Sequence, residues 1–376
     1  MPKKIAFVKI GSFSHANEFL ATALRNQFPH HELEVFDVWK LAREHKGFFT
    51  RNLPYVAKEY GLDLLLKRRK FSQCMTRTTY IFREFSKLAA QQINQCDHAF
   101  SFQTQTMFDA SREGVKHFVY TDHTALANLH YPSLSKQERQ AALVSNRWIQ
   151  QERAIYQHAA VNFPMSQFIA RSMIEDYGCP HEKVVCVYAG GNLAYQSEPT
   201  PKNYASKTII FVGVEWERKG GPELAKAFAL VRQTHPDANL IVVGCTPQIS
   251  LPNCRIVGKV PVQSIRQYYD QASIFCLPTR REPFGFVFVE AMLEKLPVVA
   301  TRIGAVPDLI SEGETGCIVE PGDVQGLATV LTKLLGDPTR CQAMGEAGHR
   351  RAKEEFSWDK VAQRIKEQVT TVVPNL

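Results

Sequence analysis

The sequence has little that points to metal or redox chemistry. It contains no Cys-x-x-Cys pair, no group of histidines at zinc-binding spacing and no Asp-x-Asp, and its nine cysteines are scattered. Scattered cysteines favour reduced thiols, so we expect a cytoplasmic protein. The first apolar stretch, residues 5–8, is too short for a signal peptide. No apolar run approaches the roughly 20 residues of a membrane span, and internal repeats and low-complexity segments are absent from the sequence.

The composition that remains is typical of a globular protein with room for two domains. The chain has 376 residues, of which 44% are hydrophobic and 22% are charged. Its net charge of +8 is uneven, because residues 1–195 hold 24 Lys and Arg against 17 Asp and Glu, a net +7. Such an asymmetry carries information about partners, and it indicates that something anionic approaches the N-terminal half.

Apolar runs with strand character alternate with helical patterns along both halves, which predicts an α/β fold. We expect a first Rossmann-like domain over residues 1–195 and a second over residues 208–356. The polar, proline-bearing residues 196–207 between them are the predicted linker. A last helix is expected over about residues 357–376.

The first predicted strand, residues 4–10, is followed by a loop with Gly11 and Ser12 and then by a helix. This is half of a Rossmann-like unit, but it lacks a full Gly-x-Gly-x-x-Gly, so dinucleotide binding is poorly supported. Gly11 and Ser12 either contact a ligand or only make a tight turn. Further along, we expect one helix over residues 136–157.

Residues 62–71 combine leucines with a run of basic side chains. An apolar and basic segment of this kind is suited to an anionic membrane surface. The alternative is a helix end that is simply solvated. The basic residues concerned are Lys67, Arg68, Arg69 and Lys70.

The stretch from Arg281 to Glu290 follows a β-rich apolar run and leads into a helical pattern. A loop of this type lies at the carboxyl end of a strand, where ligands bind in open α/β sheets. The start of the new helix suits phosphate, because its first N–H groups lack helical partners. Glu282 lies in the loop and Glu290 about five residues into the helix, roughly 7 Å further along. This separation is too long for a carboxylate pair acting on one bond, but it suits two parts of one long ligand.

Glu282-Pro-Phe-Gly285, followed by Glu290-Ala-Met, resembles the signature of the family-four retaining glycosyltransferases, the group 1 glycosyl transferases of the GT-B fold. That fold consists of two Rossmann-like domains facing a central cleft. The resemblance implies that Glu282 contacts the donor sugar and that Glu290 binds the ribose of the nucleotide. It also implies that Gly285 and the amides of Phe286 and Val287 contact the diphosphate.

A second strand–loop–helix pattern runs from Thr208 through Gly213 to the pair Arg218-Lys219 before Gly220. Developing negative charge on a leaving diphosphate requires a preorganised positive environment of this kind. The resemblance assigns phosphate contact to Lys219. Many relatives carry an Arg directly after the strand glycine, where this chain has Val214, and Arg218 is the candidate to supply that cation.

Three further positions take roles from the resemblance. His123 follows a predicted strand at residues 117–120, where a family histidine hydrogen-bonds the donor sugar. The alternative for His123 is that it only caps the loop. Lys259 and Val260 follow another strand, in a region where relatives hold the nucleotide base, mostly through the backbone. Gly213, and Gly11 and Ser12 in the first domain, are placed among the donor-binding residues as well. Residues 184–192, which end in Gly190-Gly191-Asn192, resemble the family's last N-domain strand and its glycine turn.

The sequence is therefore interpreted as a retaining, hexosyl-type glycosyltransferase that moves a sugar from a nucleotide-diphosphate-sugar to an acceptor hydroxyl. Because Asp-x-Asp is absent, we expect neither a bridging metal nor a cofactor, and the nucleotide-sugar is a substrate of unknown base. The acceptor is a glycan, a glycolipid or a small molecule, and no nucleic acid is expected. The alternatives are an epimerase or phosphorylase on the same fold, or a non-catalytic protein that binds an anionic ligand.

Overall fold

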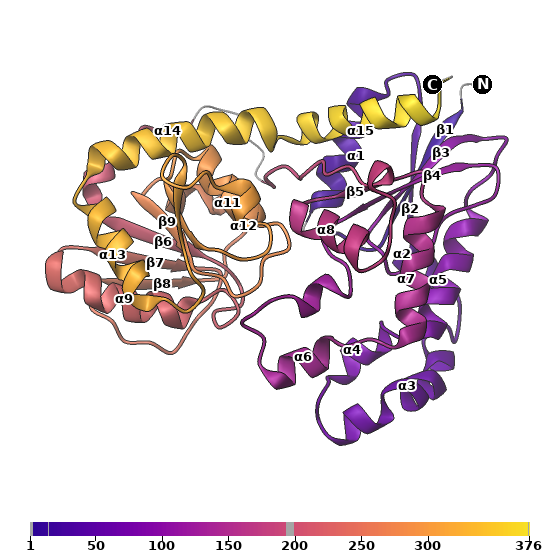
Figure 1. The fold of residues 1–376 in the computed structure, drawn as a ribbon, viewed down its shortest axis with the longest axis horizontal. Coiled ribbons are helices and arrows are strands. Elements are labelled where there is room, and N and C mark those ends of the chain that lie inside the picture. The colour runs from indigo at the N-terminus through magenta and orange to yellow at the C-terminus, as the bar shows by residue number, and fades with distance from the viewer. Residues whose placement is uncertain (1–2, 14, 193–198, 375) are drawn as a thin grey trace. The chain divides into compact units, whose positions relative to one another are not determined.

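The computed structural model describes residues 3–13, 15–192, 199–374 and 376. The chain divides into two compact units, one formed by residues 1–188 and 358–376 and the other by residues 189–357 (Figure 1). The expected linker, residues 196–207, lies outside the described residues over 196–198. Its described part contains a short 3-10 turn, Tyr204–Ser206, and belongs to the second unit.

The first unit is built on one parallel sheet of five strands in the order β2-β1-β3-β4-β5. The strands are β1 (Lys4–Lys9), β2 (Leu33–Asp37), β3 (His98–Thr104), β4 (Lys116–Thr121) and β5 (Val161–Pro164). β1 and β3 are neighbours in the sheet, and the chain order reverses between them. Loops that leave the carboxyl ends of strands at such a reversal form the usual ligand crevice of a doubly wound sheet.

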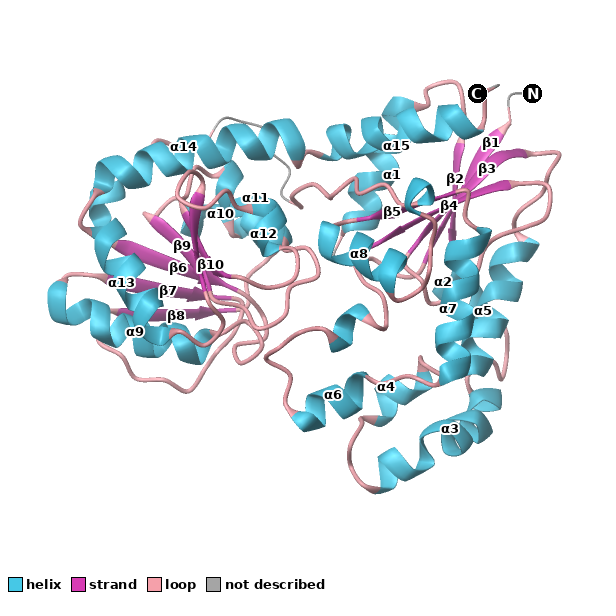
Figure 2. Cartoon of the chain, in the orientation of Figure 1, coloured by secondary structure: helices cyan, strands magenta, loops and turns pink. Residues whose placement is uncertain are grey.

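Helices cover both faces of this sheet (Figure 2). Helix α1 packs against the last helix, α15, where the rings of Phe19 and Trp358 stack at 6.4 Å between centroids. Helix α2 packs against α5. The helices of this unit are α1 (Ala16–Gln27), α2 (Val38–Glu44), α3 (Leu53–Leu65), α4 (Phe71–Met75), α5 (Thr79–Gln91), α6 (Lys136–Ala142), α7 (Asn146–His158), α8 (Gln167–Glu175) and α15 (Trp358–Val372).

Two expectations about the first unit were wrong in detail. The single helix predicted over residues 136–157 is two helices, because Leu143 is not helical and Ser145 caps a new helix by accepting a hydrogen bond from the Trp148 amide. The strand that the resemblance places at the start of residues 184–192 is reduced to an isolated parallel bridge between Asn162 and Val184. A capping side chain therefore divides the first segment, and the second pairs with β5 at a single position.

The second unit contains a parallel sheet of six strands in the order β11-β10-β9-β6-β7-β8. The strands are β6 (Thr208–Val212), β7 (Asn239–Val243), β8 (Cys254–Gly258), β9 (Ile274–Leu277), β10 (Val298–Thr301) and β11 (Gly316–Val319). This is the Rossmann strand order, with the chain reversal between β6 and β9, which pair directly. The carboxyl ends of all six strands meet at one edge of the sheet.

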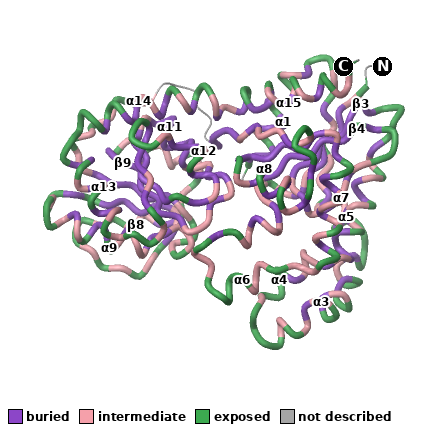
Figure 3. The backbone as a smooth tube through the Cα atoms, in the orientation of Figure 1, coloured by how far each residue is buried: buried purple, intermediate pink, exposed green. Residues whose placement is uncertain are grey.

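The helices of the second unit connect these strands and pack in pairs, α9 on α13 and α11 on α14. They are α9 (Gly221–Thr234), α10 (Arg266–Tyr269), α11 (Phe286–Leu293), α12 (Val306–Leu309), α13 (Val324–Leu335) and α14 (Pro338–Glu355). Buried stretches follow the strands and the sheet-facing sides of the helices (Figure 3). Across the described part of the chain, we find no helix with both the length and the apolar character needed to cross a bilayer.

Candidate active site

The loops after β6 and β9 are tied together at the reversal point of the second sheet. The backbone amide of Arg280 donates to the carbonyl of Arg218 at 2.9 Å, and the Arg218 guanidinium donates to the carbonyl of Arg281 at 3.1 Å. Two segments that are about sixty residues apart in the chain therefore form one structure at the ligand-binding edge of the sheet.

The close approach of these loops depends on Gly220, which precedes α9. Its backbone has a φ of 74°, in the left-handed region, and a Cβ atom added there would lie 1.8 Å from the carbonyl oxygen of Pro278. A side chain is excluded both by the backbone conformation and by the neighbouring loop. Gly220 therefore brings the segment with Lys219 against the end of β9.

Lys219 and Glu282 form an ion pair across the two loops. The Lys219 Nζ lies 2.5 Å from the Glu282 Oε2, and only 11% and 6% of the two side chains are exposed. The backbone carbonyl of Glu282 also accepts from the Ala305 amide at 3.0 Å, which fixes the loop from the side of α12. The two charged groups are close together and largely shielded from water. Such an ion pair can orient a hydroxyl group through the carboxylate and stabilise an anion through the cation.

Arg218 has a different environment from Lys219. Its Nε lies 2.6 Å from the Glu215 Oε2, and a second nitrogen of the guanidinium bonds to the carbonyl of Arg281. The Glu215 partner is largely exposed, so this pair lies at the rim of the loops. The structure therefore brings Arg218 next to Lys219 and gives it a role in joining the loops.

Helix α11 begins beside this ion pair. Gly285 precedes it with a φ of 104°, and an added Cβ would lie 2.5 Å from the ring of Phe288 and 3.2 Å from the Glu282 side chain. Phe286 and Val287 form the first turn, where backbone N–H groups point out of the helix and the dipole favours negative charge. The cation of Lys219 and the positive end of α11 therefore meet around Glu282.

Glu290 is the fifth residue of α11, and it is buried away from Lys219's ion pair. Its Oε1 accepts from the Asn192 backbone amide at 3.3 Å, and its Oε2 accepts from the Tyr269 hydroxyl at 3.4 Å. Desolvation by burial raises the pKa of Glu290 to about 7, although these two hydrogen bonds act in the opposite direction. A carboxylate of this kind gains from any further hydroxyl donor that reaches it.

The sequence did not indicate that Asn192 and Tyr269 contact Glu290, because neither residue belongs to a recognisable motif. Asn192 follows a glycine pair that packs on α11, where a Cβ atom added to Gly191 would lie 3.2 Å from the Leu293 side chain and 3.4 Å from that of Val289. Tyr269 closes α10 and is fully buried. The Gly190-Gly191-Asn192 run was recognisable as a turn, but its contact with α11 was not.

Gly213, Lys259 and Val260 lie along the same edge of the sheet. The Gly213 amide donates to the carbonyl of Val243 at 2.9 Å, and the Gly244 amide donates to the carbonyl of Gly258 at 2.8 Å, so the ends of β6, β7 and β8 are joined in sequence. Lys259 is exposed directly after β8, and Val260 is half-buried. Gly213 lies against Lys219, since a Cβ atom added to it would be 3.2 Å from the Lys219 side chain. Lys259 and Val260 follow β8, on the side of β6 opposite to β9.

In the first unit, the loop after β1 is held by Gly11. Its backbone has a φ of 62°, its amide donates to Asp37 Oδ1 at 3.2 Å, and its carbonyl accepts from the Asn17 amide group at 3.1 Å. Gly11 therefore makes a tight turn, which is one of the two roles that the sequence allowed for it. Ser12 is exposed beside it, at the reversal point between β1 and β3.

His123 lies at the carboxyl end of β4, in the same unit. Its Nδ1 is 2.7 Å from Asp122 Oδ1, and its side chain is one-third exposed. Burial lowers the pKa of His123, but the charge and hydrogen bond of Asp122, with the charge of Glu152, outweigh it and leave the pKa raised. The imidazole is thus oriented by a carboxylate, with its other nitrogen turned away from that partner.

Glu152 is a residue whose importance was not evident from the sequence. It is a buried carboxylate on α7 that ties together the loops after β3 and β4, and desolvation raises its pKa. Its two oxygens accept from the Ala125 amide at 3.2 Å each, from Thr106 at 3.1 Å and from Tyr156 at 3.0 Å, as well as from the Tyr177 hydroxyl. Glu152 therefore fixes the loop that carries His123.

The basic run differs from expectation at one position. Arg69 points inward, because its side chain is 4% exposed, lies 2.8 Å from Asp63 and donates to the carbonyls of Gln140 and Ala141 at 3.0 Å each. The prediction that Arg69 faces an anionic surface was therefore wrong. Lys67, Arg68 and Lys70 are exposed, although Arg68 also lies 3.8 Å from Asp63.

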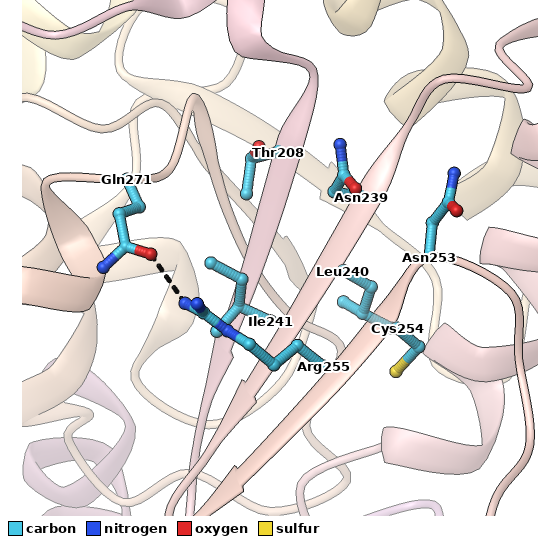
Figure 4. Close-up of a pocket in the computed structure, with 8 residues that line it drawn as sticks. All are labelled: Thr208, Asn239, Leu240, Ile241, Asn253, Cys254, Arg255 and Gln271. Atoms are coloured by element: carbon cyan, nitrogen blue, oxygen red, sulfur yellow. Dashed lines mark hydrogen bonds between the residues drawn. The ribbon is translucent and has the colours of Figure 1, made fainter.

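A pocket of about 390 Å³ lies at the opposite end of the second sheet (Figure 4). It is lined by the first residues of β6, β7 and β8, including Thr208, Asn239 and Cys254, and by the hydrogen-bonded pair Arg255 and Gln271. Ligands of open α/β sheets bind at the carboxyl ends of the strands, so this pocket is distinct from the candidate site. Among the described residues, no three His, Cys, Asp or Glu side chains cluster closely enough to hold a metal ion.

Comparison with known proteins identifies part of the chain. Residues 206–337 match the family model described as "Glycosyl transferases group 1". A GDP-mannose-dependent monoacylated α-(1-6)-phosphatidylinositol monomannoside mannosyltransferase of Corynebacterium glutamicum is 33% identical over 164 residues, which are 39% of this chain and 43% of that protein. A D-inositol 3-phosphate glycosyltransferase of Corynebacterium aurimucosum is 27% identical over 277 residues, 66% of this chain and 64% of that protein. The chain thus spans less than two thirds of the length of both relatives.

Solved structures match over the whole chain. Sucrose-phosphate synthase from Thermosynechococcus elongatus has a TM-score of 0.70 at 18% identity, covering 100% of both chains. Anabaena Alr3699/HepE in complex with UDP has a TM-score of 0.64 at 16% identity, covering 98% of this chain and 100% of that one. With two parallel sheets, one in each unit, the protein has the GT-B fold that the sequence predicted.

Proposed function

We propose that this chain, which carries a group 1 glycosyl transferase domain over residues 206–337, transfers a sugar from a nucleotide diphosphate to an acceptor hydroxyl with retention of configuration. The observation that supports this most is the ion pair of Lys219 and Glu282 at the start of α11. It joins a cation, a carboxylate and a helix N-terminus at the reversal point of a Rossmann-like sheet.

In the proposed reaction, the acceptor hydroxyl oxygen bonds to the anomeric carbon of the sugar while the bond from that carbon to the diphosphate breaks. Negative charge develops on the leaving diphosphate, which takes up the hydroxyl proton. Lys219 and the amides of Phe286 and Val287 stabilise that charge, because they are already oriented before the reaction begins. Glu282 accepts hydrogen bonds from the donor sugar, and Glu290 accepts from the ribose hydroxyls. Arg218 acts at the edge of the same site, where it holds the two loops together.

Metal independence is part of the proposal. A diphosphate leaving group requires positive charge, and Lys219 together with the positive end of α11 supplies it from the protein. Transfer should therefore persist in the presence of a chelator. A loss of activity with EDTA that added Mg²⁺ or Mn²⁺ restores would contradict this part of the proposal and leave the remainder standing.

The donor is identified by a binding experiment. Uridine, guanosine and adenosine diphosphates and their sugar conjugates are added to the protein, and its melting temperature is followed. Binding at 100 times the dissociation constant stabilises by about 2.7 kcal/mol, so one base should stand out. A relative named above depends on GDP-mannose and a structural neighbour binds UDP, so these two bases come first. If every nucleotide leaves the melting temperature unchanged, the proposal fails.

We further propose that the first unit attaches peripherally to anionic membranes at the inner face. The surface concerned, called here the 62–71 surface, consists of the exposed side chains Leu62, Leu65, Leu66, Lys67, Arg68, Lys70 and Phe71. Leu65 is 78% and Phe71 54% exposed, which is unusual for large apolar residues in one short segment. Exposed stretches follow α3 and α4, where this surface lies (Figure 3).

Co-sedimentation with vesicles tests this attachment. Each basic residue near an anionic bilayer contributes about 1 kcal/mol, so neutralising Lys67, Arg68 and Lys70 together should weaken binding about 100-fold. Vesicles without anionic lipid are one control, and neutralisation of Arg69 is omitted because that side chain is internal. Equal sedimentation of the wild type and the triple variant would favour the alternative, a solvated helix end.

A further inference from the structure

The pocket in Figure 4, called here the amino-edge pocket, is built largely on one face of the second sheet. In the strand register Thr208 pairs with Asn239, and Ile241 pairs with Arg255, so these four side chains project to the same side. Gln271, which precedes β9, completes the lining next to Arg255. The volume of about 390 Å³ lies within the range of small-molecule sites. The pocket therefore has room for a small ligand.

The strand starts that carry the pocket are firmly joined. The Leu240 amide donates to the carbonyl of Asn253 at 2.9 Å, which connects β7 to the residue before β8. The Thr208 amide donates to Ser273 Oγ at 3.0 Å, and the Ser273 amide donates to the carbonyl of Thr208 at 2.8 Å. Asn253 has a φ of 57°, a left-handed conformation that asparagine adopts more readily than most residues. The pocket is therefore preformed.

The guanidinium of Arg255 is oriented across this pocket. One of its terminal nitrogens donates to Gln271 Oε1 at 2.6 Å, as the dashed line in Figure 4 shows. Its central carbon lies 5.7 Å from the ring centroid of Tyr268 on α10. Gln271 is itself held, because its Nε2 donates to the carbonyl of Gln267 at 2.6 Å. The other N–H groups of Arg255 therefore have a fixed direction and remain available to a ligand.

The positive charge of Arg255 is not neutralised inside the protein. Among the residues that the structure describes, no carboxylate forms an ion pair with it. The acidic residues next to the lining are paired with lysines, Asp237 with Lys207 at 2.8 Å and Asp270 with Lys202 at 2.9 Å. Guanidinium keeps its proton in proteins, and its planar fork matches the oxygens of carboxylate and phosphate. The pocket is therefore suited to an oxyanion.

Two amide oxygens at the pocket add hydrogen-bond acceptors. The Asn253 amide nitrogen donates to the carbonyls of Pro236 and Ala238 at 3.1 Å each, and that of Asn239 donates to the carbonyl of Asp237 at 3.0 Å. Within the described part of the chain, no donor reaches Oδ1 of either asparagine. Each oxygen can therefore accept a hydrogen bond from a ligand hydroxyl.

We infer that the amino-edge pocket binds a small hydroxylated oxyanion, namely a polyol that carries a carboxylate or a phosphate group. Arg255 donates to the oxyanion, while Asn239 and Asn253 accept from the hydroxyls. Ile241 contacts the carbon chain between them. The site lies at the amino ends of strands whose carboxyl ends form the candidate active site, so it is separate from that site. The inference does not depend on the proposed function.

The test follows the melting temperature of the full chain with gluconate, sorbitol 6-phosphate or sorbitol, at constant ionic strength. The three probes share a six-carbon polyol chain and differ in the charged group. Sorbitol measures the effect of the polyol alone. We expect an anionic probe at about 10 times its dissociation constant to raise the melting temperature by about 2 °C or more beyond the rise with sorbitol.

Gln271→Glu is the sharpest variant. It keeps an acceptor for the Arg255 guanidinium but places a negative charge beside it, so the protein should fold normally and lose the anion-specific rise. Arg255→Met, which keeps the apolar stem and removes the charge, should lose it as well. Arg340→Met removes an exposed arginine of α14 and should leave the rise intact. Lys219→Ala should also leave it intact, because Lys219 lies at the other edge of the sheet.

No rise beyond that with sorbitol would overturn the inference, and so would a rise that persists in Gln271→Glu and Arg255→Met. A rise that Lys219→Ala removes would assign the anion to the candidate active site and refute the pocket. Crystals of the wild type grown with the probe that acts give an answer that does not depend on a variant's folding. Density for the probe within hydrogen-bond distance of Arg255 supports the site, and density only elsewhere refutes it.

The two anionic probes separate the sources of the oxyanion. A rise that depends on Arg255 with gluconate alone assigns a carboxylated polyol, and one with sorbitol 6-phosphate alone assigns a phosphorylated polyol. Equal rises with both support the shared oxyanion chemistry. None of these measurements involves sugar transfer, so their outcome is independent of the glycosyltransferase proposal.

Discussion

Lys219 and Glu282 are 63 positions apart in the chain, and their side chains meet at 2.5 Å where the loops after β6 and β9 join. Each belongs to a separate strand–loop–helix unit, and each unit alone would be unremarkable in an α/β protein. Their meeting places a cation at the start of α11, where a diphosphate would gain most from it. Had the two segments lain on different faces of the second unit, the glycosyl-transfer proposal would have been lost.

Lys219→Ala should lower the rate of transfer by about 10²–10³-fold, which is the usual effect of removing one oriented donor from a developing anion. Removing Lys219 also leaves the buried Glu282 carboxylate without its ion-pair partner, so the melting temperature is measured beside the rate. Steady-state kinetics with the donor found in the nucleotide panel measures the effect. Lys226→Ala is the matched control, because Lys226 is exposed on α9, seven residues further along. Activity that survives Lys219→Ala would remove Lys219 from the proposed mechanism.

Glu282→Gln should separate the two halves of the ion pair. Lys219 is then released from its carboxylate partner, so the free nucleoside diphosphate should bind at least as tightly as it does to the wild type. The sugar conjugate should lose the extra affinity that Glu282 provides, and turnover should fall. Calorimetric titration with the diphosphate and with its sugar conjugate measures both effects. Weaker binding of the free diphosphate would show that Glu282 serves the phosphates and not the sugar.

Glu290 makes the stability of the second unit depend on pH. Its pKa in the folded protein, about 7, lies above the ordinary value of 4.5, so the folded state holds the proton more tightly. The wild type should therefore lose about 3 kcal/mol relative to Glu290→Gln as the pH rises from about 4.5 to above 7. Urea unfolding at pH 5 and pH 8 compares the two proteins. If the two proteins differ by the same free energy of unfolding at pH 5 and at pH 8, the raised pKa of Glu290 is contradicted.

The same substitution should weaken nucleotide binding if Glu290 holds the ribose. Affinity of the wild type for the diphosphate should increase as the pH rises through 7, because the ionised carboxylate is the better acceptor. Glu290→Gln should have lower affinity and lack this component of the pH dependence. Titration of the nucleotide itself affects both proteins equally, so the difference between them is the informative quantity. Unchanged affinity in Glu290→Gln would exclude the ribose role.

Asp122 should control the protonation of His123. The raised pKa of His123 means that the Asp122 interaction contributes stability below pH 6.5 and loses it as the pH rises through the folded pKa. Asp122→Asn should lower the pKa of His123, which an NMR titration of the imidazole measures directly. Asp109→Asn is the control, because Asp109 lies 2.7 Å from a different histidine, His158. An unchanged titration of His123 in Asp122→Asn would contradict the assigned cause.

Gly220→Ala should disrupt the junction of the two loops, since its Cβ would overlap the Pro278 carbonyl. Gly322→Ala provides the comparison, because Gly322 has a similar φ of 84° but open space around it. The left-handed backbone alone should cost about 1–2 kcal/mol in Gly322→Ala. Gly220→Ala should be less stable than Gly322→Ala by at least about 2 kcal/mol, which is a typical effect of steric strain in a packed region. Equal unfolding midpoints in urea would mean that the loops move apart without cost.

The local elements could be read from the sequence because local rules produce them. Apolar runs of four to seven residues predicted the strands, and the Glu-Pro-Phe-Gly stretch with its following Glu-Ala-Met predicted the loop and helix that hold Glu282 and Glu290. The division of residues 136–158 at Ser145 was missed, because a single capping hydroxyl outweighed a continuous helical pattern.

The sequence by itself determined the α/β class, the strand–loop–helix units and the chemistry available in each loop, since these follow from residue type and spacing along the chain. Only the tertiary structure decided which loops meet. It paired Lys219 with Glu282, placed Asn192 and Tyr269 on Glu290 and turned Arg69 inward. The physical reason is that charge pairing and desolvation depend on distances of a few ångströms between groups far apart in the chain, and sheet order and glycine contacts set those distances.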